Sequence, residues 1–318
     1  MQEQFYIVFP NKGVIIIKYF IITIDTEGDN LWAVKDISQN ITTENADYIY
    51  RFQELCEKYN FVPTYLTNYE MAISKPMIEL GREGIKNNTL EIGAHIHSWN
   101  QPPMYKLVKG VGKRGKPYLG EYPNEILIQK IDYLTKTLED TFQVGITSHR
   151  GGRWYFDNRI LNELVRLNYL VDCSCTPGVS WRGKKGWTSF SKGSDWENYP
   201  NAPFFLNSNE NKKILEIPVT IKKISDERTL WFRPDGNNKN DMLRLIKNNS
   251  NNYIEFMLHS SELMPGGSPT FRREWQISKL YYDLETIFSE LQKAEYKGIG
   301  VTDFSKLIRD DIKMERKI

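Results

Sequence analysis

Histidine and cysteine are both scarce in this chain of 318 residues, which has four histidines and three cysteines. Three cysteines cannot form a disulfide framework, so a small secreted scaffold held by disulfides is excluded. Cys173 and Cys175 form a C-x-C pair with no second pair, which is a weak metal signal, and we expect both to be strand residues. The cysteine content fits a reducing compartment.

Long apolar runs and a large net charge are also missing. The apolar stretch at residues 14–24 is interrupted by Lys18 and is shorter than the roughly 20 residues that a membrane-spanning helix needs. It lacks a basic region followed by a small-residue cleavage site, so we expect no export signal and a cytoplasmic protein. The formal net charge of +2 gives no field that would attract nucleic acid as a partner.

Short apolar runs alternate along the chain with longer amphipathic patterns. Strands are expected at residues 19–25, 61–67, 90–97, 145–150, 169–175, 214–221, 252–260 and 298–307. Helices are expected at residues 42–60, 76–87, 124–142, 158–168, 238–249 and 273–296. This order predicts an α/β protein in which helices cover a parallel sheet of about seven strands. Because no linker or change of composition interrupts the pattern, we expect one barrel-like domain at residues 18–318, preceded by an N-terminal extension at residues 1–17.

Two long loops are expected, at residues 102–123 and 176–210, and both have an unusual composition. The first is rich in lysine and glycine, with its basic side chains at 106–116. We expect a solvated loop there, with a contact to an anionic sugar or phosphate as the alternative. The second holds Trp181, Trp187 and Trp196. Tryptophans most often fill a core, and the alternative is that they form stacking platforms for sugars.

Polar residues that carry chemistry collect where the expected strands end. Two carboxylates, three histidines and an arginine stand at these positions: Asp25, Glu27, His95, His97, Arg150 and His259. Parallel barrels place their chemistry at the C-terminal ends of the strands, so we expect one site there. Side chains two residues apart on a strand point the same way. His149 is the neighbour of Arg150, so it points to the opposite side and is expected to be structural.

These residue types are the ones that metal-assisted hydrolysis requires. Two imidazoles and one carboxylate bind a divalent metal and leave positions open for water and substrate. The second carboxylate is then free to act as a base, and Arg150 pairs with it and keeps it ionised. His259 protonates a leaving amine as a general acid. Such a set hydrolyses an amide or an ester through a tetrahedral oxyanion.

Five segments between residues 19 and 304 together resemble the polysaccharide deacetylase family, the carbohydrate esterases of the chitooligosaccharide deacetylase type. In chain order these segments are TIDTEGD, EIGAHIHSW, SHRGGRW, VDCSCTPG and LHSSE. The resemblance implies a distorted (β/α) barrel and metal-dependent N- or O-deacetylation of sugars. Two departures, D-x-E in place of adjacent aspartates and H-x-H in place of histidines four apart, are similar to a divergent branch of that family.

The resemblance also implies roles for individual residues. Glu27, His95 and His97 are taken as metal ligands and Asp25 as the base, while the exchange of Asp25 and Glu27 stays open. Arg150 and His259 take the arginine and acid roles. The metal is expected to be Zn, with Co, Ni or Fe as alternatives, because imidazole and carboxylate suit all of them.

Four further residues are expected to contact the substrate: Trp99, Arg153, Trp154 and Asp172. Each has a structural alternative. Arg153 would instead pair with a nearby carboxylate, and the tryptophans would pack a loop. Asp172 would hold a loop or cap a turn.

The sequence thus predicts a hydrolase acting on carbon-nitrogen bonds that removes an acetyl or similar acyl group from an amino sugar or surface-polysaccharide precursor. Two alternatives stay open. One is a metal-independent hydrolase of a cyclic amide, and the other is a catalytically inactive relative that binds glycan.

Overall fold

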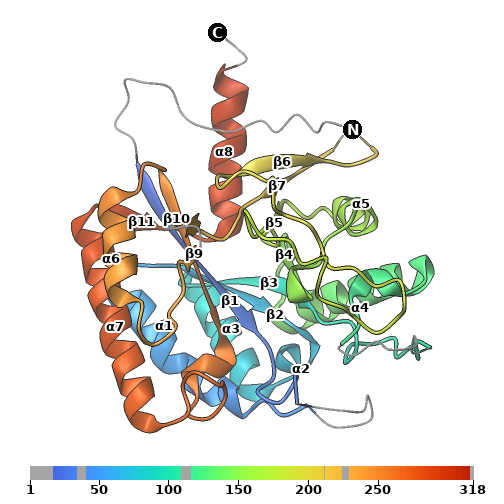
Figure 1. The fold of residues 1–318 in the computed structure, drawn as a ribbon, viewed down its shortest axis with the longest axis horizontal. Helices are drawn as coiled ribbons and strands as arrows, with labels where there is room; N and C mark the ends of the chain where they lie inside the picture. The colour runs from blue at the N-terminus through green and yellow to red at the C-terminus, as the bar shows by residue number, and fades with distance from the viewer. Residues whose placement is uncertain (1–16, 34–40, 109–115, 211, 224–228, 316–318) are drawn as a thin grey trace.

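The structure is a computed structural model that describes residues 17–33, 41–108, 116–210, 212–223 and 229–315. Its centre is a sheet of nine strands in the order β10-β1-β2-β3-β4-β5-β7-β6, with β11 also paired to β1 (Figure 1). The strands are β1 Lys18–Thr26, β2 Pro63–Thr67, β3 Glu91–Ile96, β4 Ser148–Gly151, β5 Val171–Asp172, β6 Phe204–Asn207, β7 Lys213–Glu216, β10 Tyr253–His259 and β11 Tyr296–Gly298. A separate two-stranded sheet is formed by β8 Ile221–Lys223 and β9 Thr229–Trp231.

The path from β10 to β7 consists of seven parallel neighbours, and β6 then pairs antiparallel with β7. Helices connect and cover these strands: α1 Ile49–Lys58, α2 Tyr69–Ala72, α3 Lys75–Asn87, α4 Asn124–Phe142, α5 Asn158–Arg166, α6 Lys239–Asn248, α7 Glu274–Lys293 and α8 Val301–Glu315. The predicted α/β fold with about seven parallel strands is therefore confirmed. The curled sheet forms a half-barrel in a single domain, which is the distorted (β/α) barrel that the resemblance implied.

The barrel is not closed, because the sheet ends at β10 on one side and at the β7–β6 pair on the other. One continuous strand was expected at 214–221, but β7 ends at Glu216 and β8 belongs to the small sheet. Pro218 lies between them and has no N–H to donate to a ladder. Side chains bridge the gap instead. The N–H of Glu255 donates to Thr220 Oγ1 at 2.9 Å, and the hydroxyl of Tyr253 reaches the carbonyl of Pro218 at 3.5 Å.

Two other expected strands differ from the structure. The strand expected at 169–175 is reduced to Val171 and Asp172, because the chain turns away directly after them. The closing strand expected at 298–307 is wrong, since β11 ends at Gly298 and α8 begins at Val301. The buried residues here are three and four positions apart, at Val301, Phe304 and Ser305. That spacing places them on one face of a helix, whereas a strand would bury alternate residues.

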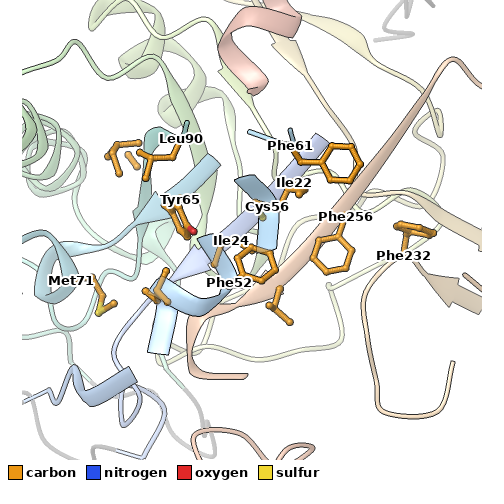
Figure 2. Close-up of a cluster of buried hydrophobic side chains, with 14 of the residues drawn as sticks. Ile22, Ile24, Phe52, Cys56, Phe61, Tyr65, Met71, Leu90, Phe232 and Phe256 are labelled. Atoms are coloured by element: carbon orange, nitrogen blue, oxygen red, sulfur yellow. The ribbon is translucent and has the colours of Figure 1, made fainter. Parts of the chain in front are cut away.

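The main hydrophobic core lies between the sheet and the helices around it. Ile22 and Ile24 of β1 pack with Phe52 of α1 and Phe256 of β10, as Figure 2 shows. Figure 1 shows α6 beside α7 on one flank of the sheet and α4 beside α5 on the other. Each of these helices buries an apolar stripe against the strands. Because helices cover the outer face of the sheet, polar side chains of the strands can reach solvent only at the strand ends.

Helix α8 covers the N-terminal ends of the strands. Its Val301 and Phe304 join the second core cluster with Ile21 of β1, and Thr302 Oγ1 donates to Glu91 at the start of β3, 2.6 Å away. The guanidinium of Arg309 donates to the carbonyls of Leu170 and Lys213 at 3.0 and 2.9 Å. Because α8 seals this end, the site has to lie at the opposite, C-terminal end of the strands.

Two expectations fall partly on residues outside the described ranges. The expected N-terminal extension lies outside them except for Ile17, and so do residues 109–115 of the basic stretch. In the part of the chain that is described, none of the helices has both the length and the apolar character needed to cross a bilayer.

Candidate active site and metal centre

Glu27, His95 and His97 converge at the C-terminal ends of β1 and β3. The Nε2 atom of His97 lies 2.7 Å from Glu27 Oε2, and that of His95 lies 3.5 Å from the same oxygen. The two Nε2 atoms are 3.0 Å apart. All three side chains are buried. One ligand atom from each residue lies within 4.8 Å of the other two, so the three could hold one metal ion.

The polar atoms of this cluster fit a cation better than they fit each other. Glu27 Oε2 is buried and accepts no hydrogen bond, although an imidazole nitrogen is close. The two imidazole Nε2 atoms also face each other at 3.0 Å, and when both rings are neutral and carry their proton on Nδ1, two lone pairs meet there that cannot satisfy one another. A divalent cation at their meeting point would satisfy two neutral imidazoles and a carboxylate at once, which is a common ligand set. The residues present therefore fit the metal that the fold family implies.

Neighbouring groups orient the cluster from outside. His95 Nδ1 lies 3.0 Å from the carbonyl oxygen of Arg150, which suits an Nδ1–H donor and leaves Nε2 as the free acceptor. The indole N–H of Trp32 donates to Glu27 Oε1 at 2.9 Å. Gly152 packs against the ring of His97, and a Cβ there would lie 2.7 Å from His97 Nδ1 and 2.4 Å from the carbonyl of Ile96. Only glycine allows this approach.

Asp25 lies beside the cluster and is held by Arg150. The guanidinium donates from Nη1 to Asp25 Oδ1 at 2.6 Å. The other oxygen, Oδ2, is 3.8 Å from the Nε2 atoms of both His95 and His259. Burial alone would raise the pKa of Asp25, but the charges of Arg150, His95 and His259 outweigh it and lower that pKa below its usual value. Asp25 is thus ionised and keeps one free oxygen.

Arg150 is completely buried and makes further bonds. Nε donates to the carbonyl of Cys173 at 2.8 Å, and Nη2 donates to Thr23 Oγ1 and Glu255 Oε1 at 2.8 and 2.9 Å. Burial raises the pKa of Glu255 to about 7, against the lowering effect of Arg150. The arginine is therefore fixed between two acids, with Asp25 on the side of the cavity and Glu255 in the barrel interior.

His259 at the end of β10 has its own ion pair behind it. Its Nδ1 lies 3.3 Å from both Glu262 Oε2 and the guanidinium of Arg233. Arg233 in turn donates to both oxygens of Glu262 at 2.8 and 2.9 Å. Burial opposes a charge on His259, but Glu262 and Glu27 outweigh it and raise the pKa of the imidazole. The pKa of Glu262 itself is lowered to about 2, since Arg233 and His259 overcome its burial.

These groups meet at a cavity of about 230 Å³ at the mouth of the barrel. Its lining consists of Asp25, Trp32, His95, His97, Tyr118, Arg153, Trp154, Trp181, Lys184 and His259. The cavity therefore combines one carboxylate and three imidazoles at its base with four aromatic rings around them. Aromatic walls with few polar groups are typical of sites for small organic ligands.

Two of the expected substrate contacts, Arg153 and Trp154, do line this cavity. Both have left-handed backbone conformations, with φ of 61° and 60°. Each such non-glycine residue costs about 1–3 kcal/mol and persists where surrounding structure fixes it, often at functional sites. The guanidinium of Arg153 stacks 3.8 Å over the ring of Tyr118 and donates to the carbonyls of Lys116 and Lys185, so its alternative role in holding loops is also present.

The other two expected contacts lie away from the cavity. Asp172 is completely buried, 2.6 Å from His149 Nδ1, and accepts the N–H of Ser174 at 3.0 Å. His149 is therefore on the opposite side of β4 from Arg150, as the alternation predicts. Trp99 is buried behind His97, with the ring centroids 4.6 Å apart. Neither Asp172 nor Trp99 is among the residues that line the cavity.

Sequence reasoning missed several residues at this site. The alternation along β10 places Glu255 on the same side as His259, so that residue could have been found. Glu262 closes the LHSSE segment three residues after His259, so its place in the sequence already put it near that histidine. Trp32 and Arg233 carry no local signal, because Trp32 stands in the loop after β1 and Arg233 in the segment that follows β9.

Comparisons with known proteins come from structure alone. No family model matches the chain, and no curated protein matches its sequence. A protein of Mycobacterium smegmatis assigned as a polysaccharide deacetylase matches with a TM-score of 0.55 and 12% sequence identity, over 95% of each chain. A 4-alpha-glucanotransferase from Thermococcus litoralis matches with a TM-score of 0.50 and 12% identity, over 91% of this chain and 38% of the other.

A CE4 family pseudoenzyme from Bacillus anthracis is more distant, with a TM-score of 0.45 and 11% identity over 91% of this chain and 66% of the other. At such identities a likeness of structure carries the fold and leaves the activity to be argued from the residues. This chain has the fold of the polysaccharide deacetylases.

Proposed function

We propose that the chain is a metal-dependent hydrolase that removes an N- or O-acyl group, such as acetyl, from an amino sugar or surface-polysaccharide precursor. One observation carries the proposal. Glu27, His95 and His97 offer three converging ligand atoms at a cavity whose wall also holds Asp25 and His259. Hydrolysis of an amide needs a base for water and an acid for the leaving amine, and both are within reach of that point.

In this proposal Glu27, His95 and His97 hold a divalent metal, and Asp25 stays outside the ligand set. The geometry supports this choice over the exchanged one, because Oε2 of Glu27 is the carboxylate oxygen nearest to both imidazoles, while Oδ1 of Asp25 is taken by Arg150. When bound, the metal supplies a Lewis acid that polarises the acyl carbonyl and makes water easier to deprotonate.

Asp25 acts as the base through Oδ2. Arg150 fixes the other oxygen and keeps the group ionised, so Oδ2 can accept a proton from water as the water oxygen attacks the acyl carbon. His259 Nε2 lies 3.8 Å from Asp25 Oδ2, and the raised pKa of its imidazole, to which Glu262 contributes against burial, favours the protonated form. When the carbon–nitrogen bond breaks, His259 Nε2 gives its proton to the leaving nitrogen, which leaves a free amine and a carboxylic acid.

The aromatic wall positions the sugar. Trp32, Trp154 and Trp181 present rings to the cavity, and Trp32 is half exposed. The faces of sugar rings carry C–H groups that pack on aromatic rings, while their hydroxyls bond to polar side chains. The cavity of about 230 Å³ is smaller than the roughly 300–1,000 Å³ of most ligand pockets, so we expect it to take a single acylated sugar unit rather than a longer glycan.

Metal content and turnover of purified protein test this proposal together. The wild type is expected to bind one equivalent of a divalent metal, Zn being the first expectation, and His97→Ala to lose it. His149→Asn is the matched control, because its imidazole lies away from the cavity and its loss leaves the ligands in place. Release of acetate is then followed on a panel of N-acetylated amino sugars.

Two results would overturn the proposal. A protein that stays metal-free after incubation with Zn, Co and Ni but releases product would be a metal-independent hydrolase. A protein that binds metal and sugar but gives no turnover with any acylated sugar would be an inactive glycan-binding relative.

A further inference from the structure

Two exposed segments border the mouth of the cavity, residues 104–108 and 181–192, which we call the mouth loops. They are tied to each other, because the indole N–H of Trp187 donates to the carbonyl of Leu107 at 3.2 Å. They are also tied to the site. Trp181 and Lys184 line the cavity, and the hydroxyl of Tyr118 on its wall donates to the carbonyl of Lys184 at 2.9 Å.

The mouth loops expose large apolar side chains to solvent. Phe190 is 91% exposed and Val108 is 87% exposed, the two highest values among the large hydrophobic residues that the structure describes. Met104 and Tyr105 are 51% and 37% exposed on the same loop as Val108. Such side chains gathered on neighbouring loops indicate an interaction surface rather than packing.

Basic side chains accompany these apolar residues. Residues 181–192 contain three lysines and one arginine and no acidic residue. Arg182 is paired with Asp195 at 3.2 Å. Lys184, Lys185 and Lys192 are exposed, as is Lys106 on the other loop, and within the described ranges their ammonium groups have no carboxylate at ion-pair distance.

One acid beside the second loop, Glu121, points inward. The carboxylate of Glu121 accepts the backbone N–H groups of Tyr118, Trp187 and Thr188, so it serves to hold the second loop. It does not face the exposed lysines as a partner. The outer surface of the mouth loops is therefore cationic, with apolar tips.

We propose that the mouth loops dock the protein on an anionic lipid membrane. Apolar side chains that enter the boundary between headgroups and acyl chains, together with lysines that face anionic headgroups, make up the usual binding mode of peripheral proteins. An acidic polysaccharide would pair with the same lysines but would leave Phe190 and Val108 in water. The apolar tips therefore favour lipid as the occupant.

Docking in this way turns the cavity toward the bilayer, because Trp181 and Lys184 belong to both the docking surface and the cavity wall. The acylated sugar would then be one that is attached to a lipid and presented at the membrane surface. This statement about the substrate rests on the proposed function, whereas membrane docking itself does not.

Cosedimentation of the full chain with lipid vesicles tests the docking. The protein is expected to bind vesicles of phosphatidylserine and phosphatidylcholine, and to bind phosphatidylcholine alone much more weakly. Binding should fall as salt is raised, since the lysines are exposed and screened by ions. Equal binding to both kinds of vesicle, or to neither, would overturn the proposal.

Two apolar variants locate the surface. Phe190→Ser and Val108→Ser are each expected to weaken vesicle binding about tenfold, because each removes an apolar side chain that becomes buried in lipid. Tyr282→Ser is the matched control, since Tyr282 is 64% exposed on α7, away from the mouth loops. A loss of binding in the control as large as in the Phe190 and Val108 variants would contradict the assignment.

Charge variants separate lipid from a polyanionic occupant. Lys185→Gln and Lys192→Gln are expected to weaken binding about fivefold each, and Lys75→Gln on α3, at an exposed position, should have no effect. Binding to dextran sulfate that is tighter than to vesicles, and unchanged by Phe190→Ser, would show an acidic glycan instead. Vesicle binding by Asp25→Asn should equal that of the wild type, so failure of the hydrolase proposal would be recognised separately.

Discussion

Two clusters of histidine and carboxylate lie at strand ends in this molecule, and they differ in what faces them. His95 and His97 line the cavity, and their acceptor atoms converge with a carboxylate oxygen of Glu27 that is left unbonded. His149 with Asp172 is as deeply buried, but the pair closes on itself at 2.6 Å. Asp172 also accepts the N–H and the hydroxyl of Ser174.

The difference teaches that residue type and position along a strand do not by themselves make a site. Arg150 and His149 are neighbours on β4, yet one points into the barrel toward Asp25 and the other points out toward Asp172. A strand has two faces, and only the face that borders the cavity gives a polar group access to substrate. The inner cluster carries chemistry in our proposal, and the outer pair carries stability.

Asp25→Asn should have the largest effect. We expect kcat for acyl release to fall about 10³-fold, because the amide cannot take a proton from water. Metal content should stay near that of the wild type, since Asp25 stands outside the proposed ligand set, whereas the unfolding midpoint should fall because the amide removes a charged acceptor from the buried bond to Arg150. Activity within tenfold of the wild type would show that Asp25 is not the base.

Asp172→Asn tests the pair of His149 and Asp172, and here we expect a loss of stability with little change in kcat. The free energy of unfolding should fall by about 2 kcal/mol, because the substitution removes a charged acceptor from a buried bond to His149. The kcat of the folded enzyme should change little. Denaturant unfolding and steady-state kinetics measure both quantities, and Asp303→Asn on the exposed side of α8 serves as a control. A large loss of kcat without loss of stability would place Asp172 in the site.

Trp32→Phe tests whether the indole N–H orients Glu27 for metal binding. Phenylalanine keeps an aromatic ring at the cavity but lacks the N–H that donates to Glu27 at 2.9 Å. We expect metal affinity to fall about tenfold, as is typical when a group that orients a ligand is lost. Competition with a chelator measures it. An unchanged affinity would mean that Glu27 needs no help from Trp32.

Glu262→Gln should produce the smallest change, a shift of the pH profile. His259 must be protonated to act as the acid, so activity is present below its raised pKa and is lost as pH rises through it. Removing the negative charge leaves Arg233 beside the imidazole and lowers the pKa of His259. The basic limb of kcat against pH should therefore move to lower pH. A basic limb at the wild-type position would exclude His259 as its origin.

Much of the site could be predicted from local pattern. The i, i+2 spacing of Asp25 with Glu27, and of His95 with His97, places each pair on one face of a strand, and alternation separates Arg150 from His149. Strand order then brings β1, β3, β4 and β10 into one sheet, since β-α-β connections make neighbours parallel. These are short-range rules that operate on a few residues at a time.

The sequence by itself determined the α/β fold with about seven parallel strands and the face on which each strand-end residue lies, because alternation and amphipathic period are properties of the local chain. Only the tertiary structure decided that the barrel stays open, that Asp172 and Trp99 are withdrawn from the cavity, and that Trp32 lines it. It also decided that Arg233 bonds to Glu262 and Glu255 to Arg150, behind the residues of the cavity wall. Those outcomes depend on which segments pack together in space, at separations that run from 5 residues for Trp32 and Glu27 to 105 for Arg150 and Glu255, and no local period records that.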